Sequence, residues 1–413
     1  MRLSLLLQRE PFGEILEQTL AEFLARWTGQ PHTVCWYGKR PSTGLLRRRG
    51  QQPWLGNIYL NAIFTPGVEP DVFDPIRREF ARSVTPWQRP LQRAYVSLAT
   101  SPLGAPRLAQ VGVGISPPLP NAEHLLIVPG NHKIRILDRH NGVVYNIAKR
   151  NFPAHFIQRE IAARQQAERL GLPVPALKTV AGDQTWFSEQ YISGTPLNRL
   201  ADPQVAKRAE QTAINALNRL LEHTAEEVAL EDYVTDLQTY IQTLIDDNHL
   251  LSAGQKRMLT ENAATLTVHV HRLSSIAGGQ LATTLTHGDF QPANVLVDGE
   301  QVWLIDWEYA ARRQAGYDAL VYGLRSRFPR GLAVRLRGLF SKADMATNLL
   351  PLACRTEFDW DDVSQRRIHG MVFLLEELAL HLEENNNLCF YELSAGLSAL
   401  QHQLDNLVCS ERG

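Results

Sequence analysis

The chain has 413 residues, which exceeds the usual size of one domain, so two or three domains are expected. Its composition is 44% hydrophobic and 21% charged with a net charge of −1, which excludes a fibrous or wholly disordered protein and gives no general reason to bind nucleic acid or a membrane surface. The charge is uneven: residues 1–120 carry 14 Lys and Arg against 8 Asp and Glu, and the remainder carries 28 against 35. This asymmetry fits either partners of opposite charge or two parts that complement each other.

The cysteines and the N-terminus bear on the cellular location. Cys35, Cys354, Cys389 and Cys409 are scattered without metal-binding spacing, a pattern that favours reduced thiols in a cytoplasm. The apolar run Leu3–Leu7 is too short for the hydrophobic part of a signal peptide, and no stretch approaches the length of a membrane span. The sequence therefore predicts a cytoplasmic protein without stable membrane insertion.

Residues 1–120 are expected to form an N-terminal α/β domain of unknown role. Phe12–Trp27 has apolar residues at helical spacing, and Asn57–Phe64 and Ala94–Ala99 have the composition of strands. Ser116–Pro120 resembles a linker because of its prolines. Such a domain could cap a cleft, contact an anionic partner or mediate a homodimer.

The pattern changes to short strands and one helix over residues 121–192. Strands are predicted at His124–Val128, Lys133–Asp138, Val143–Lys149 and Thr185–Ile192, with a helix at Phe156–Leu170. Asn141-Gly142 between two of these strands is a strong hairpin signal, because both residues tolerate positive φ. A small β-rich lobe is therefore expected here.

Residues 193–413 are predicted to be mainly helical. Apolar residues recur at helical spacing in Val205–His223, Ile368–Leu382 and Phe390–Leu407, and one strand-like break interrupts them at Thr283–Asp306. The fold class expected is α+β: an N-terminal α/β domain, a small β-rich lobe and a large helical lobe that holds a β-hairpin. A cleft between two such lobes is a natural nucleotide pocket.

The break at Thr283–Asp306 contains the strongest functional signal. Two apolar strands flank Asp298-Gly299, a favoured hairpin turn. Folding this hairpin brings Asn294, before the first strand, close to Asp306, after the second. Asp289 lies on the loop that leads in, so the sequence predicts three polar residues at one end of a rigid hairpin.

These residue types suit phosphoryl transfer. A carboxylate must orient the attacking hydroxyl and accept its proton, and Asp289 fits that role. Hard oxygen ligands must hold Mg²⁺ across the phosphates, and Asn294 and Asp306 fit that role. The alternative is that these residues simply form turns, as Asp and Asn commonly do. Residue chemistry alone leaves both interpretations open.

A family resemblance separates them. His287-Gly288-Asp289, four residues and Asn294, followed by Ile305–Glu308 with Asp306, resembles the signature of the aminoglycoside phosphotransferase and choline kinase family. The resemblance implies a bilobal protein-kinase-like fold with ATP and Mg²⁺ as cofactors. It also implies that His287 anchors the catalytic loop and that Asp318 braces it.

The resemblance extends upstream of the hairpin. It implies that Lys149, at the end of a strand, holds the α- and β-phosphates and pairs with Glu160 of the following helix. The turn at Gly130 stands where the family covers the phosphates, although no GxGxxG pattern is present. Glu189 and Ile192 lie in the segment that resembles the interlobe connector, whose backbone takes the adenine.

The function expected is therefore that of an ATP- and Mg²⁺-dependent small-molecule O-phosphotransferase. Its acceptor would be a hydroxyl of a metabolite, aminoglycoside, amino alcohol or saccharide. The alternative is a catalytically inactive kinase-like binding or scaffold protein with residues 1–120 as its interaction module. Glu376-Glu377 and Glu383-Glu384 either line a pocket for a cationic acceptor or form a solvated helix face.

Overall fold

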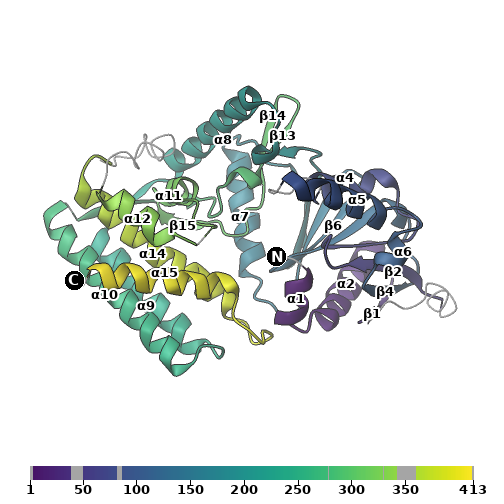
Figure 1. Cartoon of the computed structure of the whole chain (residues 1–413), viewed down its shortest axis with the longest axis horizontal. Coiled ribbons are helices and arrows are strands. Elements are labelled where there is room, and N and C mark those ends of the chain that lie inside the picture. Colours follow the sequence, from purple (N-terminus) through teal and green to yellow (C-terminus); the bar gives the residue numbers. More distant parts are fainter. Residues whose placement is uncertain are drawn as a thin grey trace. The chain divides into compact units, whose positions relative to one another are not determined.

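The computed structural model describes residues 3–38, 50–80, 86–277, 279–328, 330–341 and 360–411. It divides the chain into two compact units, each with its own core. The first unit comprises Met1–Ile161 and Pro175–Thr195, and the second comprises Ala162–Val174 and Pro196–Gly413. Both helices and sheets are present, as the α+β expectation required (Figure 1).

A nine-stranded antiparallel sheet forms the centre of the first unit. Its strands, in spatial order, are β1 (Thr33–Tyr37), β4 (Val111–Ser116), β2 (Gln52–Asn57), β3 (Ala62–Phe64), β5 (Leu125–Pro129), β6 (Lys133–Asp138), β7 (Val143–Ala148), β9 (Trp186–Gln190) and β8 (Leu177–Val180). Its helices are α1 (Leu3–Arg9), α2 (Phe12–Thr28), α4 (Asp74–Phe80), α5 (Arg89–Ala99), α6 (Ala105–Leu108) and the first part of α7 (His155–Arg169).

Successive side chains of this sheet pack into two hydrophobic cores, one on each face. Leu125 and Ile127 of β5 pack in a cluster with Leu16 and Leu20 of α2, whereas Leu126 packs in a second cluster with side chains of α4 and α5. The alternation follows from the period of two in a strand, which points successive side chains to opposite faces. Helices therefore cover both faces of the sheet.

The boundary expected at residue 120 falls inside this unit. Ile63 of β3 pairs with Ile127 of β5, so residues 1–120 and 121–192 contribute strands to one continuous sheet. Local sequence did not reveal this pairing because it joins segments far apart in the chain. The N-terminal α/β domain expected from the sequence is thus not a separate compact unit.

Local predictions in the first unit have mixed outcomes. The helix at Phe12–Trp27 is confirmed as α2, and the Asn141-Gly142 hairpin joins β6 to β7 with Gly142 at a φ of 63°. The strand expected at Ala94–Ala99 is wrong, since those residues lie in helix α5. Pro90 in its first turn and the buried Val96 and Ala99, three residues apart, fit a helix that packs one face on the core.

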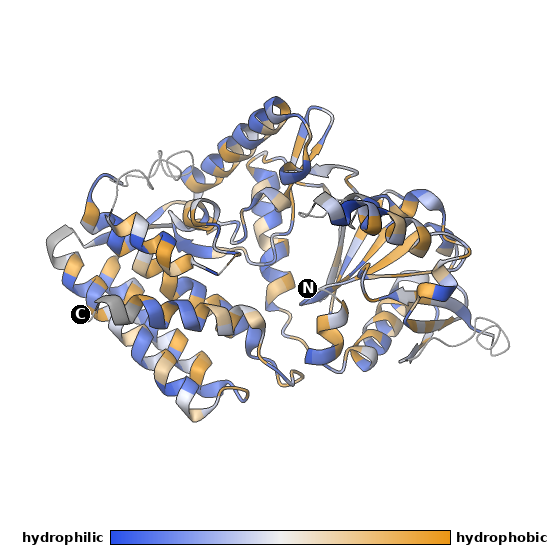
Figure 2. Cartoon of the chain, viewed as in Figure 1, coloured by the Kyte–Doolittle hydropathy of each residue, from blue (hydrophilic) through white to orange (hydrophobic). Residues whose placement is uncertain are grey.

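The second unit is mainly helical. Its helices are the last part of α7, α8 (Pro203–Thr224), α9 (Leu230–Asp247), α10 (Ala253–Ala277), α11 (Tyr317–Leu324), α12 (Leu332–Ser341), α14 (Val363–Asn385) and α15 (Ala395–Glu411). Its strands are β11 (Glu226–Ala229), β12 (Gln280–Thr286), β13 (Val295–Asp298), β14 (Gln301–Leu304) and β15 (Ala311–Gln314). Hydrophobic and hydrophilic stretches alternate along the long helices (Figure 2), as amphipathic helices require.

Helix α14 is the central element of this unit. It packs on α9, α10, α12 and α15, and it buries residues around most of its circumference. Asp362 begins the helix, because its side chain accepts a hydrogen bond from the Ser364 backbone N–H at 2.6 Å. A helix buried around most of its circumference offers fixed positions for polar groups, and Glu376 and Glu377 use them.

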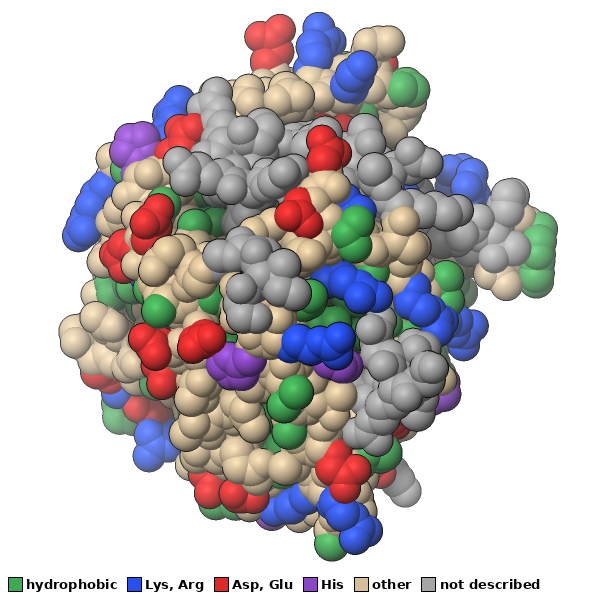
Figure 3. Space-filling view, turned by 90° about the vertical axis from the view of Figure 1, so that its left-hand side faces the viewer, with side chains coloured by type: hydrophobic (Ala, Val, Ile, Leu, Met, Phe, Trp, Pro, Cys, Tyr) green, Lys and Arg blue, Asp and Glu red, His purple; other side chains and the backbone are tan. Residues whose placement is uncertain are grey.

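Two further observations concern the surface of the chain. Over the residues that the structure describes, no helix is long and apolar enough to cross a membrane. Acidic and basic side chains lie interspersed among those coloured on the face in Figure 3.

Candidate active site

The predicted hairpin is present and has the expected register. Val295 of β13 pairs with Leu304 of β14, and Gly299 at the turn has a φ of 61°. The backbone N–H of Ile305 donates to the carbonyl of Asn294 at 3.0 Å. The hairpin therefore places Asn294 next to the chain that leads into Asp306.

Asp318 holds the loop that precedes the hairpin. Its carboxylate accepts the backbone N–H groups of His287 at 2.7 Å and Gly288 at 2.9 Å. Asp318 lies in the first turn of α11 and is fully buried, and this burial raises the pKa of its carboxyl group. Gly288 has a φ of 82°, and a Cβ there would clash with the carbonyl of Tyr309, so the bend requires glycine.

His287 links the loop to the end of strand β14. Its Nε2 lies 3.0 Å from the carbonyl of Ile305, and its Nδ1 accepts the backbone N–H of Asp289 at 3.3 Å. These partners assign the proton to Nε2 of a neutral ring. Complete burial lowers the pKa of the imidazole, which agrees with that neutral form. The side chain is placed to anchor the loop rather than to transfer protons.

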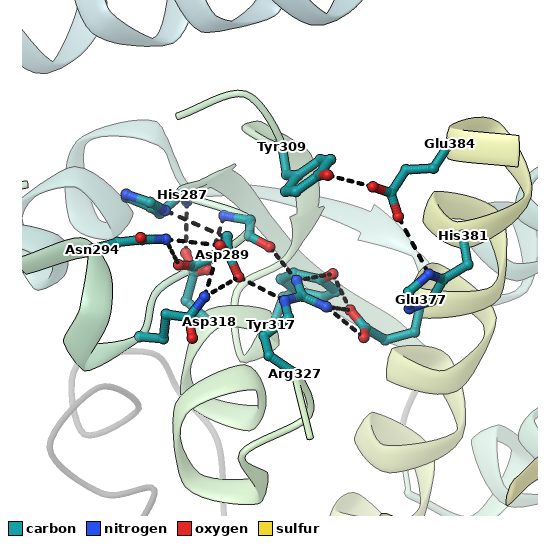
Figure 4. Close-up of polar contacts among 12 residues, drawn as sticks. His287, Asp289, Asn294, Tyr309, Tyr317, Asp318, Arg327, Glu377, His381 and Glu384 are labelled. Atoms are coloured by element: carbon teal, nitrogen blue, oxygen red, sulfur yellow. Dashed lines mark hydrogen bonds and ion pairs between the residues drawn. The ribbon is translucent and has the colours of Figure 1, made fainter. Parts of the chain in front are cut away.

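Asp289 is the centre of a dense set of polar contacts (Figure 4). Its Oδ2 accepts Asn294 Nδ2 at 2.7 Å, and Gln291 Nε2 lies 3.0 and 2.9 Å from Oδ1 and Oδ2. Arg327 Nε donates to Oδ1 at 2.6 Å. Burial raises the pKa of Asp289 to about 6, while the Arg327 guanidinium opposes that rise and the charge of Asp306 adds to it.

Asn294 and Asp306 meet the chemical requirements of a magnesium site. Asn294 donates through Nδ2 to the carbonyl and the carboxylate of Asp289, so its amide oxygen is the atom for a cation. Asp306 has a φ of 67°, a backbone conformation that costs about 1–3 kcal/mol and is concentrated at functional sites. Mg²⁺ usually binds through one or two carboxylates together with substrate phosphates and water, so this donor set fits.

Arg327 and Gln291 contact Asp289 but were missed by the sequence interpretation, which also gave Glu377 a different role. Gln291 lies within the motif and could have been noted from its spacing alone. Arg327 has no local signal, because its contacts with the loop and with Glu377 of α14 join segments that are distant in the chain. Arg327 Nη1 bonds both carboxylate oxygens of Glu377, at 3.0 and 2.7 Å.

Glu376 and Glu377 of α14 match neither alternative expected from the sequence. They form neither a solvated helix face nor an open acidic pocket. Both side chains are buried, with 3% and 1% of the residue exposed. Glu376 accepts from Tyr233 Oη at 2.6 Å, from Gln314 N at 2.8 Å and from Gln314 Nε2 at 2.9 Å. These partners come from within the second unit, so the Glu376 carboxyl group belongs to the core.

Glu376 predicts a specific pH dependence of stability. Burial raises the pKa of the Glu376 carboxyl group from 4.5 to about 7. The protonated carboxyl group therefore stabilises the fold fully below pH 4.5, its pKa in the unfolded chain, and this stabilisation is lost as the pH rises through about 7, its pKa in the folded protein. When the pH is raised from 5 to 8, we expect the unfolding free energy of Glu376→Gln to increase by about 2 kcal/mol relative to that of wild type. Urea unfolding at both pH values measures this change. Glu261→Gln, at an exposed position of α10, is the control. An equal pH response of both variants would contradict the raised pKa of Glu376.

The structure corrects the sequence interpretation of which lysine pairs with Glu160. Lys133 Nζ donates to the two carboxylate oxygens of Glu160 at 2.8 and 2.7 Å, and both side chains are buried. Lys149, the predicted partner, instead donates to Glu10 Oε1 at 2.5 Å. Lys133 begins strand β6, beside the end of β7, because Lys133 and Ala148 pair across the two strands.

The remaining nucleotide-site predictions also lie in the first unit. Gly130 forms the turn between β5 and β6, where a Cβ would lie 2.6 Å from the carbonyl oxygen of Lys133. Asn131 in the same turn is buried and accepts Arg9 Nη1 at 3.1 Å. Glu189 on β9 accepts Asn146 Nδ2 at 3.0 Å, and Ile192 follows that strand.

Comparisons with known proteins identify the family. A model of the family described as "Phosphotransferase enzyme family" matches residues 133–347, more than half of the chain, including the loop and hairpin above. The chain belongs to this family. The resemblance seen in the sequence is thereby confirmed, and the protein is a phosphotransferase. A search among curated proteins gives no match.

Solved structures that match this phosphotransferase include three kinases with low sequence identity to it. Choline kinase LicA from Streptococcus pneumoniae has 14% identity and a TM-score of 0.45, and the match covers 71% of this chain and 92% of that one. Aminoglycoside phosphotransferase APH(4)-Ia with ADP and hygromycin B has 14% identity and a TM-score of 0.43, with coverage of 70% and 94%. A glucosamine kinase with glucosamine, ADP and inorganic phosphate has 15% identity and a TM-score of 0.39, with coverage of 68% and 79%.

Proposed function

We propose that this phosphotransferase moves the γ-phosphoryl group of ATP to a hydroxyl of a small molecule, with Asp289 as the general base. The arrangement of Asp289, Asn294 and Asp306 at the end of the hairpin supports this proposal most directly. A carboxylate with a pKa near 6 is ionised at neutral pH and is still basic enough to accept a proton from a hydroxyl as the phosphoryl group arrives.

Asn294 and Asp306 would hold Mg²⁺ through their side-chain oxygens. The metal, when bound, supplies neutralisation of the charge that develops on the phosphates. The chain itself supplies the orientation. Asp318 and His287 fix the loop backbone, and Asn294 fixes the Asp289 carboxylate. A rigid loop of this kind supports catalysis because it removes the entropic cost of orienting the base during the reaction.

Lys133 takes over, in this proposal, the phosphate-binding role that the sequence assigned to Lys149. A Lys–Glu pair in which the glutamate orients the ammonium group is what that role requires, and Lys133 with Glu160 forms such a pair. Gly130, Glu189 and Ile192 remain predicted nucleotide contacts. A cytoplasmic location, which fits the free Cys35 and Cys389, and a homodimer through residues 1–120 remain predictions as well.

An acceptor screen tests the function. Wild-type protein with MgATP is incubated with hydroxylated compounds, and ADP formation and phosphorylated product are both measured. The panel includes amino alcohols such as choline, amino sugars such as glucosamine, aminoglycosides such as hygromycin B, and neutral saccharides. We expect stoichiometric ADP and phosphate ester with one of these classes, and no product when EDTA removes the metal.

The rival function is an inactive scaffold that has kept the fold. It predicts no product with any acceptor and no increase in melting temperature when MgATP is added. A protein that binds MgATP should instead melt at a higher temperature, because a ligand at 100 times its Kd adds about 2.7 kcal/mol to the free energy of unfolding. The filled positions of Asp289, Asn294 and Asp306 favour the enzyme. A flat melting temperature together with an empty screen would favour the scaffold.

A further inference from the structure

Arg327 reaches the catalytic loop from outside it. Helix α11 ends at Leu324. Arg325 follows in a left-handed conformation with a φ of 50°, and its backbone N–H caps the carbonyls of Val321 and Tyr322. This turn reverses the chain after the helix. The side chain of Arg327 then lies between the loop that holds Asp289 and helix α14 (Figure 4).

Every donor group of the Arg327 guanidinium has an acceptor. Nε donates to Asp289 Oδ1 at 2.6 Å, Nη1 to the Glu377 oxygens at 3.0 and 2.7 Å, and Nη2 to Gly288 O at 2.5 Å and Tyr317 Oη at 3.5 Å. A guanidinium has five N–H donors, so these contacts use the whole group. Arg327 is therefore built as a bridge between protein groups rather than as a cation that binds the acceptor.

Glu377 makes the bridge rigid. Its side chain is 1% exposed, it lies on the buried helix α14, and it also accepts the hydroxyl of Tyr317. Nη1 of Arg327 bonds both carboxylate oxygens of Glu377, and hydrogen bonds between two charged groups are stronger than neutral ones. The position of Arg327 is consequently tied to the core of the second unit.

The other side chains that bond the Asp289 carboxylate are weaker restraints. Gln291 and Asn294 are neutral amides from the same loop, so they move with it. Among the described residues, Arg327 supplies the charged contact to Asp289 from a different segment. It bonds the loop twice, through the carboxylate and through the Gly288 carbonyl.

We propose that Arg327, held by Glu377, is a positioning residue that fixes the Asp289 carboxylate for reaction with the acceptor hydroxyl. This role rests on the proposed function of Asp289 as the base. Arg327 touches neither the acceptor nor the phosphates in this role. Its effect is on the rotation of the carboxylate and on the backbone of the loop, so it acts on kcat rather than on substrate affinity.

The test uses variants that separate positioning from folding. Arg327→Met alone leaves Glu377 buried without its cation, so the double variant Arg327→Met with Glu377→Gln removes both charges together. We expect its kcat to fall about 10- to 100-fold, because a misplaced reacting group costs about that much, with the KM for ATP within about twofold of wild type. Arg327→Lys should show a similar loss, since a compact ammonium with three donors cannot reproduce the planar arrangement of five donors by which the guanidinium joins Asp289, Gly288 and Glu377.

Arg312→Met is the matched control. Arg312 lies on β15 in the same unit and pairs at the surface with Glu226 at 3.0 Å. We expect it to keep the wild-type kcat. A double variant or an Arg327→Lys variant with wild-type kcat would overturn the proposal, as would a change confined to KM. If the double variant does not fold, the kcat of Arg327→Lys decides alone.

Failure of this inference is distinct from failure of the proposed function. Wild-type protein that transfers phosphate, with an inactive Asp289→Asn and a normal Arg327 double variant, would refute only the positioning role. Wild-type protein without product on any acceptor would refute the function itself, and the positioning role with it.

Discussion

Asp289→Asn is expected to lower kcat by about 10²–10⁴-fold, the contribution typical of a general base. The amide keeps the shape of the carboxylate but cannot accept the acceptor proton. We expect the variant to fold normally, because burial disfavours the native charge and Arg327 keeps its pair with Glu377. Steady-state rates together with the melting temperature measure both effects, and Asp289→Ala should show the same loss of rate.

Asp298→Asn is the matched control for that substitution. It makes the same chemical change in the same hairpin, but at the exposed turn opposite the site. Asn-Gly is as favourable as Asp-Gly in such a turn. We expect wild-type activity and stability from this variant. Equal rates for wild type and Asp289→Asn would exclude the carboxylate as the base and would return the motif to a purely structural role.

Lys149→Met is expected to destabilise the first unit by about 3–5 kcal/mol, the range for breaking a buried ion pair. The side chains of Lys149 and Glu10 are both 0% exposed and lie 2.5 Å apart. The ammonium also lies 4.8 Å from the ring centre of Phe152 and 5.5 Å from that of Phe12. Removal of the lysine leaves the Glu10 carboxylate buried without its cation, which is the source of the cost.

The double variant Lys149→Met with Glu10→Gln should recover most of this stability, because both charges are removed together. Lys178→Met, at an exposed position of β8, is the surface control. Urea unfolding of the three variants measures the differences. A single variant as stable as wild type would show that the Lys149–Glu10 pair does not support the fold.

The change in melting temperature on addition of MgATP separates the two candidate phosphate lysines. We expect Lys149→Met to keep the rise in melting temperature on addition of MgATP, and Lys133→Met to lose it. Both variants break a buried pair, so both should be less stable without nucleotide. A loss of the nucleotide response in Lys149→Met, with retention in Lys133→Met, would restore the assignment made from the sequence.

Local structure was predictable where short-range interactions decide it. Asp298-Gly299 and Asn141-Gly142 gave correct hairpins, since positive φ at such turns depends on residues adjacent in the chain. Helix α2 followed from its apolar period. The strand expected at Ala94–Ala99 failed because a short apolar segment does not by itself separate helix from strand.

The β-hairpin of β13 and β14 is what the sequence by itself determined about this protein. The Asp298-Gly299 turn specifies the register, so the backbone of Asn294 bonds that of Ile305, next to Asp306, and the side chain of Asn294 bonds Asp289. These contacts lie within one continuous segment, so local turn chemistry is enough to form them.

Only the tertiary structure decided which charges meet across the chain. Lys149 bonds Glu10, 139 residues away, and Arg327 joins Asp289 and Glu377, 38 and 50 residues away. Such pairs depend on how the sheet and helices pack, and the spacing of residues along the chain carries no record of that packing. The physical reason is that a buried charge takes whichever opposite charge the fold places beside it, since leaving it unpaired is costly.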